Sequence, residues 1–189
     1  LNRILEGSQA TKGAMYFHFD SKEDLARAVM ETALERFVET ADRWTQREDL
    51  DSLEILHGMI DELALRLQTD PVVQAEFRLI IEPDFYPDVQ TAGCRVWRSV
   101  AHTLAKRAKS EGILRPDVDV NRFIRTLAAV LGGQRYIADL FGERTALRQR
   151  FQEAYEVVVE ASATPEWLAG WRTNGWRVEA SADELVASV

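Results

Sequence analysis

The chain has 189 residues, long enough for one large domain or for a small module joined to a larger one. Apolar residues make up 46% and charged residues 29%, the balance of a soluble globular protein, and no run of about 18 apolar residues predicts a membrane-spanning helix. The net charge of −8 argues against a protein that coats nucleic acid non-specifically, and a single cysteine, Cys94, excludes an internal disulfide, so we expect a cytoplasmic protein.

The chain opens with two short helical segments joined by a turn. "LNRILEG", Leu1 to Gly7, has the pattern of the last two turns of a helix, with no starting Met and no cap before it. We therefore expect the natural N-terminus to lie upstream. The second segment runs from Thr11 to about Phe17, and two short helices with a glycine at the break are typical of a helix-turn-helix.

Capping residues, and apolar positions three or four residues apart, predict the helices that follow. They run from Ser21 to Trp44, Ser52 to Thr69, Asp70-Pro71 to a point before Pro83, Asp88 to about Gly112, Asp119 to about Phe141 and Thr145 to about Glu160, with a short tryptophan-rich helix from Thr164-Pro165. The alternation with period two that indicates strands is scarce. The sequence therefore predicts an all-α protein.

The exposed face of the second short segment suits a groove of DNA. Small or polar side chains at its N-terminus let the backbone come close, and the free N–H groups there favour phosphate. We predict DNA contacts from Thr11, Lys12, Gly13, Tyr16, His18 and Lys22. The alternative interpretation is that Tyr16, Phe17 and Phe19 only form a hydrophobic knot between two helices.

The stretch "TKGAMYFHFDSKEDLA", Thr11 to Ala26, resembles the signature of TetR-type transcriptional repressors, and within them the γ-butyrolactone receptor branch of actinobacteria. It is similar to their recognition helix, to the Tyr-x-His-Phe exit from it, and to the start of the linking helix. The first helix of the family's DNA-binding domain is absent from this sequence. The resemblance divides the chain into a DNA-binding domain with its linking helix, residues 1–44, and a helical ligand-binding and dimerisation domain, residues 45–189.

The resemblance also implies partners and a mechanism. Members of the family are homodimers that place two recognition helices, about 34–36 Å apart, in successive major grooves of a pseudo-palindromic operator. The dimer surface would come from the helices Asp119–Phe141 and Thr145–Glu160, where Gly132-Gly133 permits close helix contact or close approach of a ligand. A small-molecule effector would make the helix from Ser21 to Trp44 swing and release the DNA.

Candidate ligand-binding residues lie on several of the predicted helices. Trp97 resembles the position of a tryptophan in the pocket of butyrolactone receptors, whereas Gln134 falls where related receptors often have Thr. Weaker candidates are Tyr136, Tyr86, Phe85, Phe77 and Arg78. Such residues suit a small oxygenated molecule, for example a lactone, furan or butenolide. Trp167 and Trp171, four residues apart, are expected to share a face and cover the bundle.

Other functions find little support in the sequence. Glu54 and His57 match half of a di-iron motif, but no second half exists, so we expect no metal and place His57 on the helix surface or with its hydrogen bonds satisfied. No nucleophile, triad or phosphate loop is recognisable, so we expect no enzyme and no cofactor. Two alternatives stay open: a TetR-type regulator for an antibiotic or an acyl thioester, and a helical ligand-binding protein that does not bind DNA.

Overall fold

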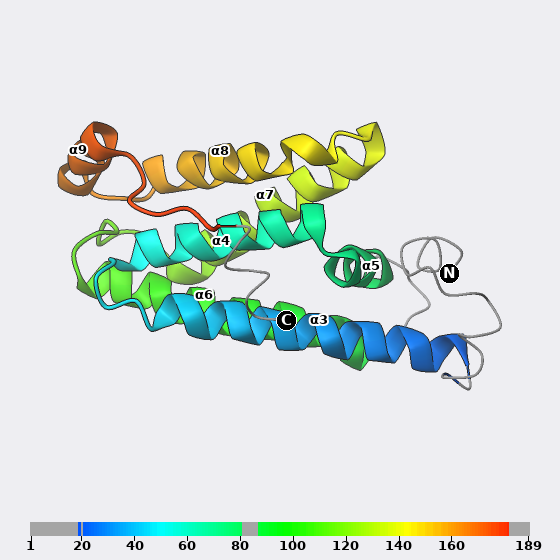
Figure 1. Ribbon diagram of the computed structural model, residues 1–189. Coiled ribbons are helices and arrows are strands. Elements are labelled where there is room, and N and C mark those ends of the chain that lie inside the picture. The colour runs from blue at the N-terminus through cyan, green and yellow to red at the C-terminus, as the bar shows by residue number, and fades with distance from the viewer. Residues whose placement is uncertain (1–18, 20, 81–86, 182–189) are drawn as a thin grey trace.

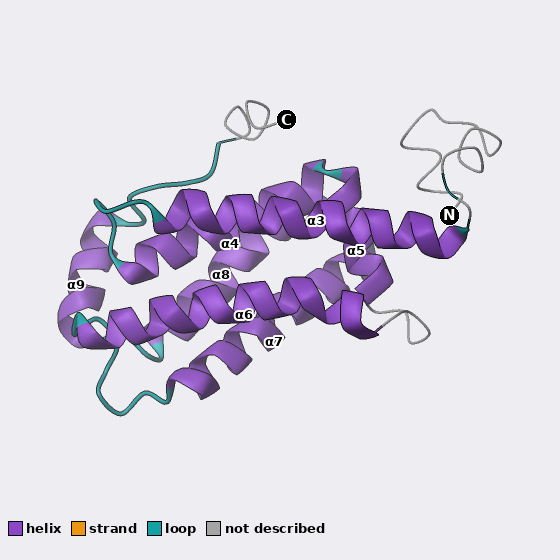
Figure 2. Ribbon diagram, turned by 90° about the horizontal axis from the view of Figure 1, so that it is seen from below, coloured by secondary structure: helices purple, strands orange, loops and turns teal. Residues whose placement is uncertain are grey.

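The computed structural model describes residues 19, 21–80 and 87–181, and these fold into helices arranged in layers (Figure 1). The elements are α3 (Lys22–Thr45), α4 (Ser52–Thr69), α5 (Pro71–Ile80), α6 (Pro87–Ser110), α7 (Val120–Phe141), the 3-10 helix η1 (Arg144–Ala146), α8 (Leu147–Glu160) and α9 (Pro165–Asn174). Figure 2 shows no strand in this part of the chain, where Leu114 and Ala163 form one isolated bridge. The all-α prediction is confirmed.

Local capping explains why these helices start where they do. The side chain of Ser21 accepts a hydrogen bond from the backbone N–H of Asp24, and that of Asp51 accepts from the N–H groups of Leu53 and Glu54. Asp119 caps α7 in the same way, and Gly142 ends it with a left-handed φ of 72°. These bonds satisfy N–H groups that have no partner inside the helix. The starts predicted at Ser21, Ser52 and Asp119 are therefore confirmed.

Two predicted helix starts need correction. Thr145 does not cap a helix: it lies inside η1, and α8 begins at Leu147 without a side-chain cap. Its backbone carbonyl instead accepts a hydrogen bond from Nε2 of Gln68, so contact with α4 determines the local path. The helix predicted from Asp88 begins one residue earlier, at Pro87, a first-turn position in which proline loses no hydrogen bond.

Helix α4 is the centre of the bundle. It packs against α3 and α6 on one side and against α8 on the other (Figure 1). Leu53, Ile55, Leu56 and Ala64 are fully buried although they point in different directions around the axis, as expected for a helix with neighbours on all sides. None of the described helices combines the length and the apolar character needed to cross a membrane.

Polar side chains of α4 are buried as well, and residues 176–180, which follow α9, contact several of them. The carboxylate of Asp61 accepts hydrogen bonds from Arg148 and from the N–H of Ala180. The ring of His57 stacks on Trp176 with centroids 4.1 Å apart. His57 is therefore not on the surface, and among the described residues its Nδ1 has no hydrogen-bond partner, so its hydrogen bonds are only partly satisfied. Burial lowers its pKa to about 4.

Candidate functional site

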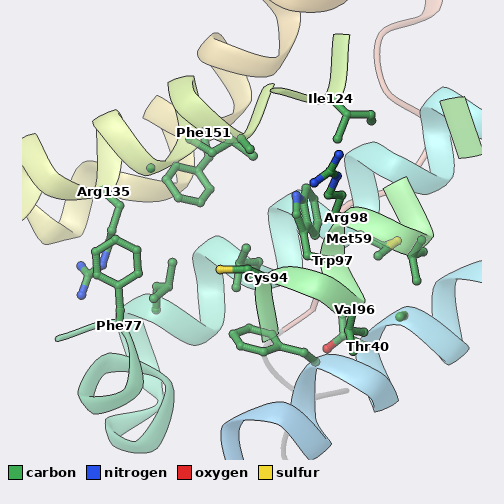
Figure 3. Close-up of a pocket in the computed structure, with 18 of the residues that line it drawn as sticks. Thr40, Met59, Phe77, Cys94, Val96, Trp97, Arg98, Ile124, Arg135 and Phe151 are labelled. Carbon is green, nitrogen blue, oxygen red and sulfur yellow. The ribbon is translucent and has the colours of Figure 1, made fainter. Parts of the chain in front are cut away.

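A cavity of about 370 Å³ lies between α3, α4, α5, α6 and α7, with Phe151 of α8 closing one end (Figure 3). Its inner wall is apolar and buried, formed by Met59, Leu67, Ile124 and Leu131 together with that phenylalanine. We call it the central pocket. Its volume and its apolar lining suit a small organic molecule.

The central pocket opens between α6 and α7. Cys94 and Arg98 on α6, and Arg125 and Ala128 on α7, line it and are exposed to solvent. Helix α7 also supplies buried wall residues, whereas α6 supplies half-buried ones such as Trp97, so a ligand that enters here would pass between these two helices.

Two ionisable side chains in the pocket wall are buried. Glu76 on α5 is 3% exposed, and burial raises the pKa of its carboxyl from 4.5 to about 7. Arg135 on α7 is completely buried, with its guanidinium carbon 5.0 Å from the centroid of the Phe77 ring. Its Nη2 lies 3.2 Å from Oδ2 of Asp139. Buried charged groups of this kind are rare unless they are paired or have a function.

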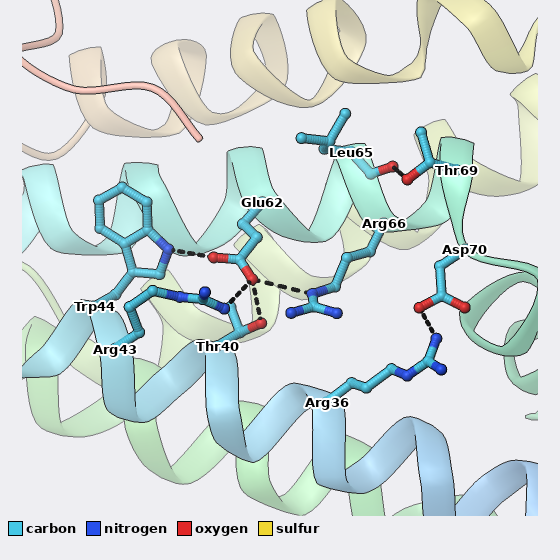
Figure 4. A network of polar contacts seen from close by, with 9 residues as sticks. All are labelled: Arg36, Thr40, Arg43, Trp44, Glu62, Leu65, Arg66, Thr69 and Asp70. Carbon is cyan, nitrogen blue, oxygen red and sulfur yellow. Dashed lines mark hydrogen bonds and ion pairs between the residues drawn. The ribbon is translucent and has the colours of Figure 1, made fainter. Parts of the chain in front are cut away.

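A polar cluster centred on Glu62 joins α3 to α4 (Figure 4). Its carboxylate accepts hydrogen bonds from Thr40 Oγ1 at 2.6 Å, Arg43 Nη2 and Trp44 Nε1 at 2.8 Å, and Arg66 Nε at 3.0 Å. We call these five residues the Glu62 network. Because Thr40 also lines the pocket, the network connects the pocket wall to the C-terminal half of α3.

The Trp44 ring of this network packs tightly against α4. A Cβ atom at Gly58 would lie 2.2 Å from Cζ3 of Trp44, far below any normal contact. Only glycine leaves room for the indole here, and this close approach places Trp44 Nε1 within reach of Glu62. The position of α3 on α4 is therefore fixed by packing and by hydrogen bonds together.

The structure brings two of the predicted ligand-binding residues together. Trp97 and Phe77 both line the central pocket (Figure 3). Gln134 is half-buried, Tyr136 is 57% exposed, and neither they nor Arg78 are among its lining residues. These three predicted positions therefore do not line the central pocket.

The remaining predicted residues lie away from the central pocket or outside the described residues. Lys22 is exposed at the start of α3, with its Nζ 3.4 Å from Oε1 of Glu23. Trp167 and Trp171 share a face, with ring centroids 6.2 Å apart, and pack against the core away from the pocket. Thr11, Lys12, Gly13, Tyr16, His18, Phe85 and Tyr86 lie outside the described residues.

Sequence reasoning missed Glu76 and Arg135, although a signal was present. Arg135 follows Leu131 by four residues and precedes Ala138 by three, so it occupies an apolar stripe of α7. Glu76 follows Val73 by three residues on α5 in the same way. A charged residue in an apolar stripe is the pattern that would have identified both.

The chain is similar in sequence and in fold to known regulators. No protein-family model matches the chain. The curated A-factor receptor protein of Streptomyces griseus is 25% identical over 182 residues, which cover 96% of this chain and 62% of that protein. The chain thus spans less than two thirds of the length of this relative.

Solved structures of regulators share the fold. One, described as the molecular basis for control of antibiotic production by bacterial hormones, is 30% identical, with 85% of this chain and 84% of the other covered and a TM-score of 0.66. A γ-butyrolactone receptor (ArpA-like protein) is 25% identical, with 92% and 81% covered and a TM-score of 0.69. The TetR family protein CprB of Streptomyces coelicolor, in complex with its operator, is 26% identical, with 94% and 84% covered and a TM-score of 0.75.

These likenesses cover 85% or more of the chain. The chain belongs to the TetR family of transcriptional regulators, in the branch of the γ-butyrolactone receptors.

Proposed function

We propose that the protein is a DNA-binding transcriptional repressor that acts in the cytoplasm as a homodimer and leaves its operator when a small signalling molecule fills the central pocket. The observation that carries this proposal is the course of α3. This single helix of 24 residues begins within the TetR-like motif, at Lys22, and lines the pocket with Phe37, Thr40 and Ala41. One rigid element thus joins the DNA-binding segment to the ligand site.

The mechanism follows from the length of that helix. At 1.5 Å per residue α3 is about 36 Å long, so a small rotation near Thr40 becomes a displacement of several ångströms at Lys22. A ligand that moves the α3 wall of the pocket therefore changes the spacing of the two recognition helices of a dimer. CprB, which has the same fold, is solved in complex with its operator, and this supports DNA as the partner.

The homodimer is supported by an exposed apolar surface on α7 and α8. Of the six large hydrophobic side chains that are exposed in the described part of the chain, five lie on these two helices, between 40% and 68% exposed: Tyr136, Ile137, Leu140, Phe141 and Val157. An apolar surface of this kind is costly in water and is typical of an interface. We propose that two copies bury it against each other and bind a pseudo-palindromic operator.

The effector is proposed to be a small oxygenated molecule of the γ-butyrolactone, furan or butenolide kind. The apolar wall around Trp97 supports this choice, as does the likeness to a γ-butyrolactone receptor. We propose no enzymatic activity and no cofactor, since the relatives are regulators.

The test uses the full-length protein encoded by the gene. Selection from a random duplex library should yield a two-fold symmetric site with half-sites about 10 base pairs apart, bound by a dimer. The substitution Leu140→Glu places a charge in the proposed interface, so we expect a monomer in sedimentation analysis and at least tenfold weaker operator binding. Val38→Glu, at an exposed position on α3, is the matched control and should leave both unchanged. A wild-type monomer that selects no duplex would refute the proposal.

A further inference from the structure

Arg135 lacks the hydrogen-bond partners that a buried guanidinium needs. The residue is 0% exposed, and among the residues that the structure describes its Nε, Nη1 and Nη2 atoms have no hydrogen-bond partner. A buried polar group without a partner destabilises the folded protein, and arginine cannot avoid this cost by losing its proton. The side chain therefore has unused capacity to bind an acceptor.

Charges near Arg135 leave an excess of positive charge. The carboxylate of Asp139, 3.2 Å from Nη2, also lies 2.5 Å from Nε of Arg144. Burial lowers the pKa of Arg135, Asp139 opposes that shift, and the positive charges of Arg144 and Arg78 add to it. One carboxylate and two further arginines thus act on Arg135, and a second anion would be attracted here.

The pocket beside Arg135 has space for a ligand. Gly132, one helical turn earlier, lines the same pocket, and a Cβ added there would meet no atom within 4 Å. Residues three apart share a face of a helix, so this open space lies along the same side of α7 as Arg135. The Phe77 ring and Phe151 form the apolar surroundings (Figure 3).

From these observations we infer that the central pocket takes a ligand with a carboxylate, and that the carboxylate binds Arg135 while the apolar part of the ligand packs between Phe77, Leu131 and Phe151. The inference rests on the proposed function, in which this pocket holds the effector. A carboxylate fits because its two oxygens match the fork of guanidinium N–H groups, which gives shorter and stronger hydrogen bonds than a neutral acceptor does. Among the effectors proposed above, this favours a furan or butenolide that bears a carboxyl group over a neutral lactone.

Calorimetric titration of the full-length protein with decanoate and with methyl decanoate tests the inference. The two probes share one acyl chain and differ only in the head group. The wild-type protein should bind decanoate at least about tenfold more tightly, the size expected for a charge-assisted hydrogen bond. Arg135→Met should bring the two affinities within about twofold of each other, with methyl decanoate still bound.

The matched control is Arg122→Met, the same substitution at an exposed arginine of α7 that is not among the residues lining the pocket. It should keep the wild-type preference for decanoate. The inference would be overturned if the wild-type protein bound both probes equally well, a result that does not depend on whether any variant folds. It would also be overturned if Arg135→Met kept the preference for decanoate. Because the titrations contain no DNA, a failure to bind operator leaves this result unaffected and contradicts the proposed function alone.

Discussion

Glu62→Gln is expected to lower the free energy of unfolding by about 3–5 kcal/mol, the usual effect of breaking a buried ion pair from one side. Glu62 is 2% exposed and accepts from four donors, of which the Arg66 side chain is almost completely buried. The amide of glutamine carries no charge and turns an NH2 group toward donors. Arg66 would then remain charged and buried without its partner.

Urea unfolding at neutral pH and fixed protein concentration measures this effect. Glu39→Gln is the matched control, because Glu39 lies on α3 next to Thr40 but is exposed, and it should change the free energy by less than about 0.5 kcal/mol. If Glu62→Gln cost no more than the control, the Glu62 network would not hold α3 on α4, and the proposed coupling between pocket and α3 would lose its physical basis.

Glu76→Gln is expected to stabilise the ligand-free protein at pH 8 by about 3 kcal/mol, because the wild-type carboxyl must then ionise inside the pocket wall. In the unfolded chain Glu76 loses its proton near pH 4.5, whereas the folded protein keeps it up to about pH 7. The contribution of Glu76 to stability is therefore complete below pH 4.5, declines as the pH rises to about 7, and stays low above that.

The measurement is the difference in unfolding free energy between Glu76→Gln and wild type from pH 4 to pH 8. The difference is needed because His57 also makes the unfolding free energy depend on pH, in the opposite direction. Its pKa is lowered to about 4 in the folded protein, so stability falls as the pH drops from 6.5 to 4. That slope is common to both proteins and cancels. Exposed Glu35 on α3 gives the control Glu35→Gln. A difference that does not vary with pH would contradict the burial of Glu76.

Helix boundaries were predictable because the information is local. A capping side chain bonds to N–H groups two or three residues away, so Ser21 and Asp119 identify helix starts whatever else the chain does. Thr145 misled the prediction for the opposite reason, since contacts between distant parts of the chain, Gln68 with Arg144 and Thr145, determine the path there.

The pocket was only partly predictable because it depends on how the helices are rotated. Neighbouring residues on a helix differ by about 100° in direction, so Arg135 faces the pocket while Gln134, one position earlier, does not. The spacing of apolar residues identifies the buried face of a helix, but it does not show which other helix packs against that face. His57 was misplaced for a related reason: the segment that buries it, around Trp176, is more than one hundred residues away in the chain.

In the proposed mechanism, a molecule in the central pocket and operator DNA at the other end of α3 oppose each other through that helix. Binding free energies are reciprocal, so the measurement is the affinity of the full-length protein for decanoate with and without saturating operator duplex. We expect operator to weaken decanoate binding at least about fivefold, and decanoate to weaken operator binding by the same factor. Equal decanoate affinity in the presence and absence of operator would contradict the account.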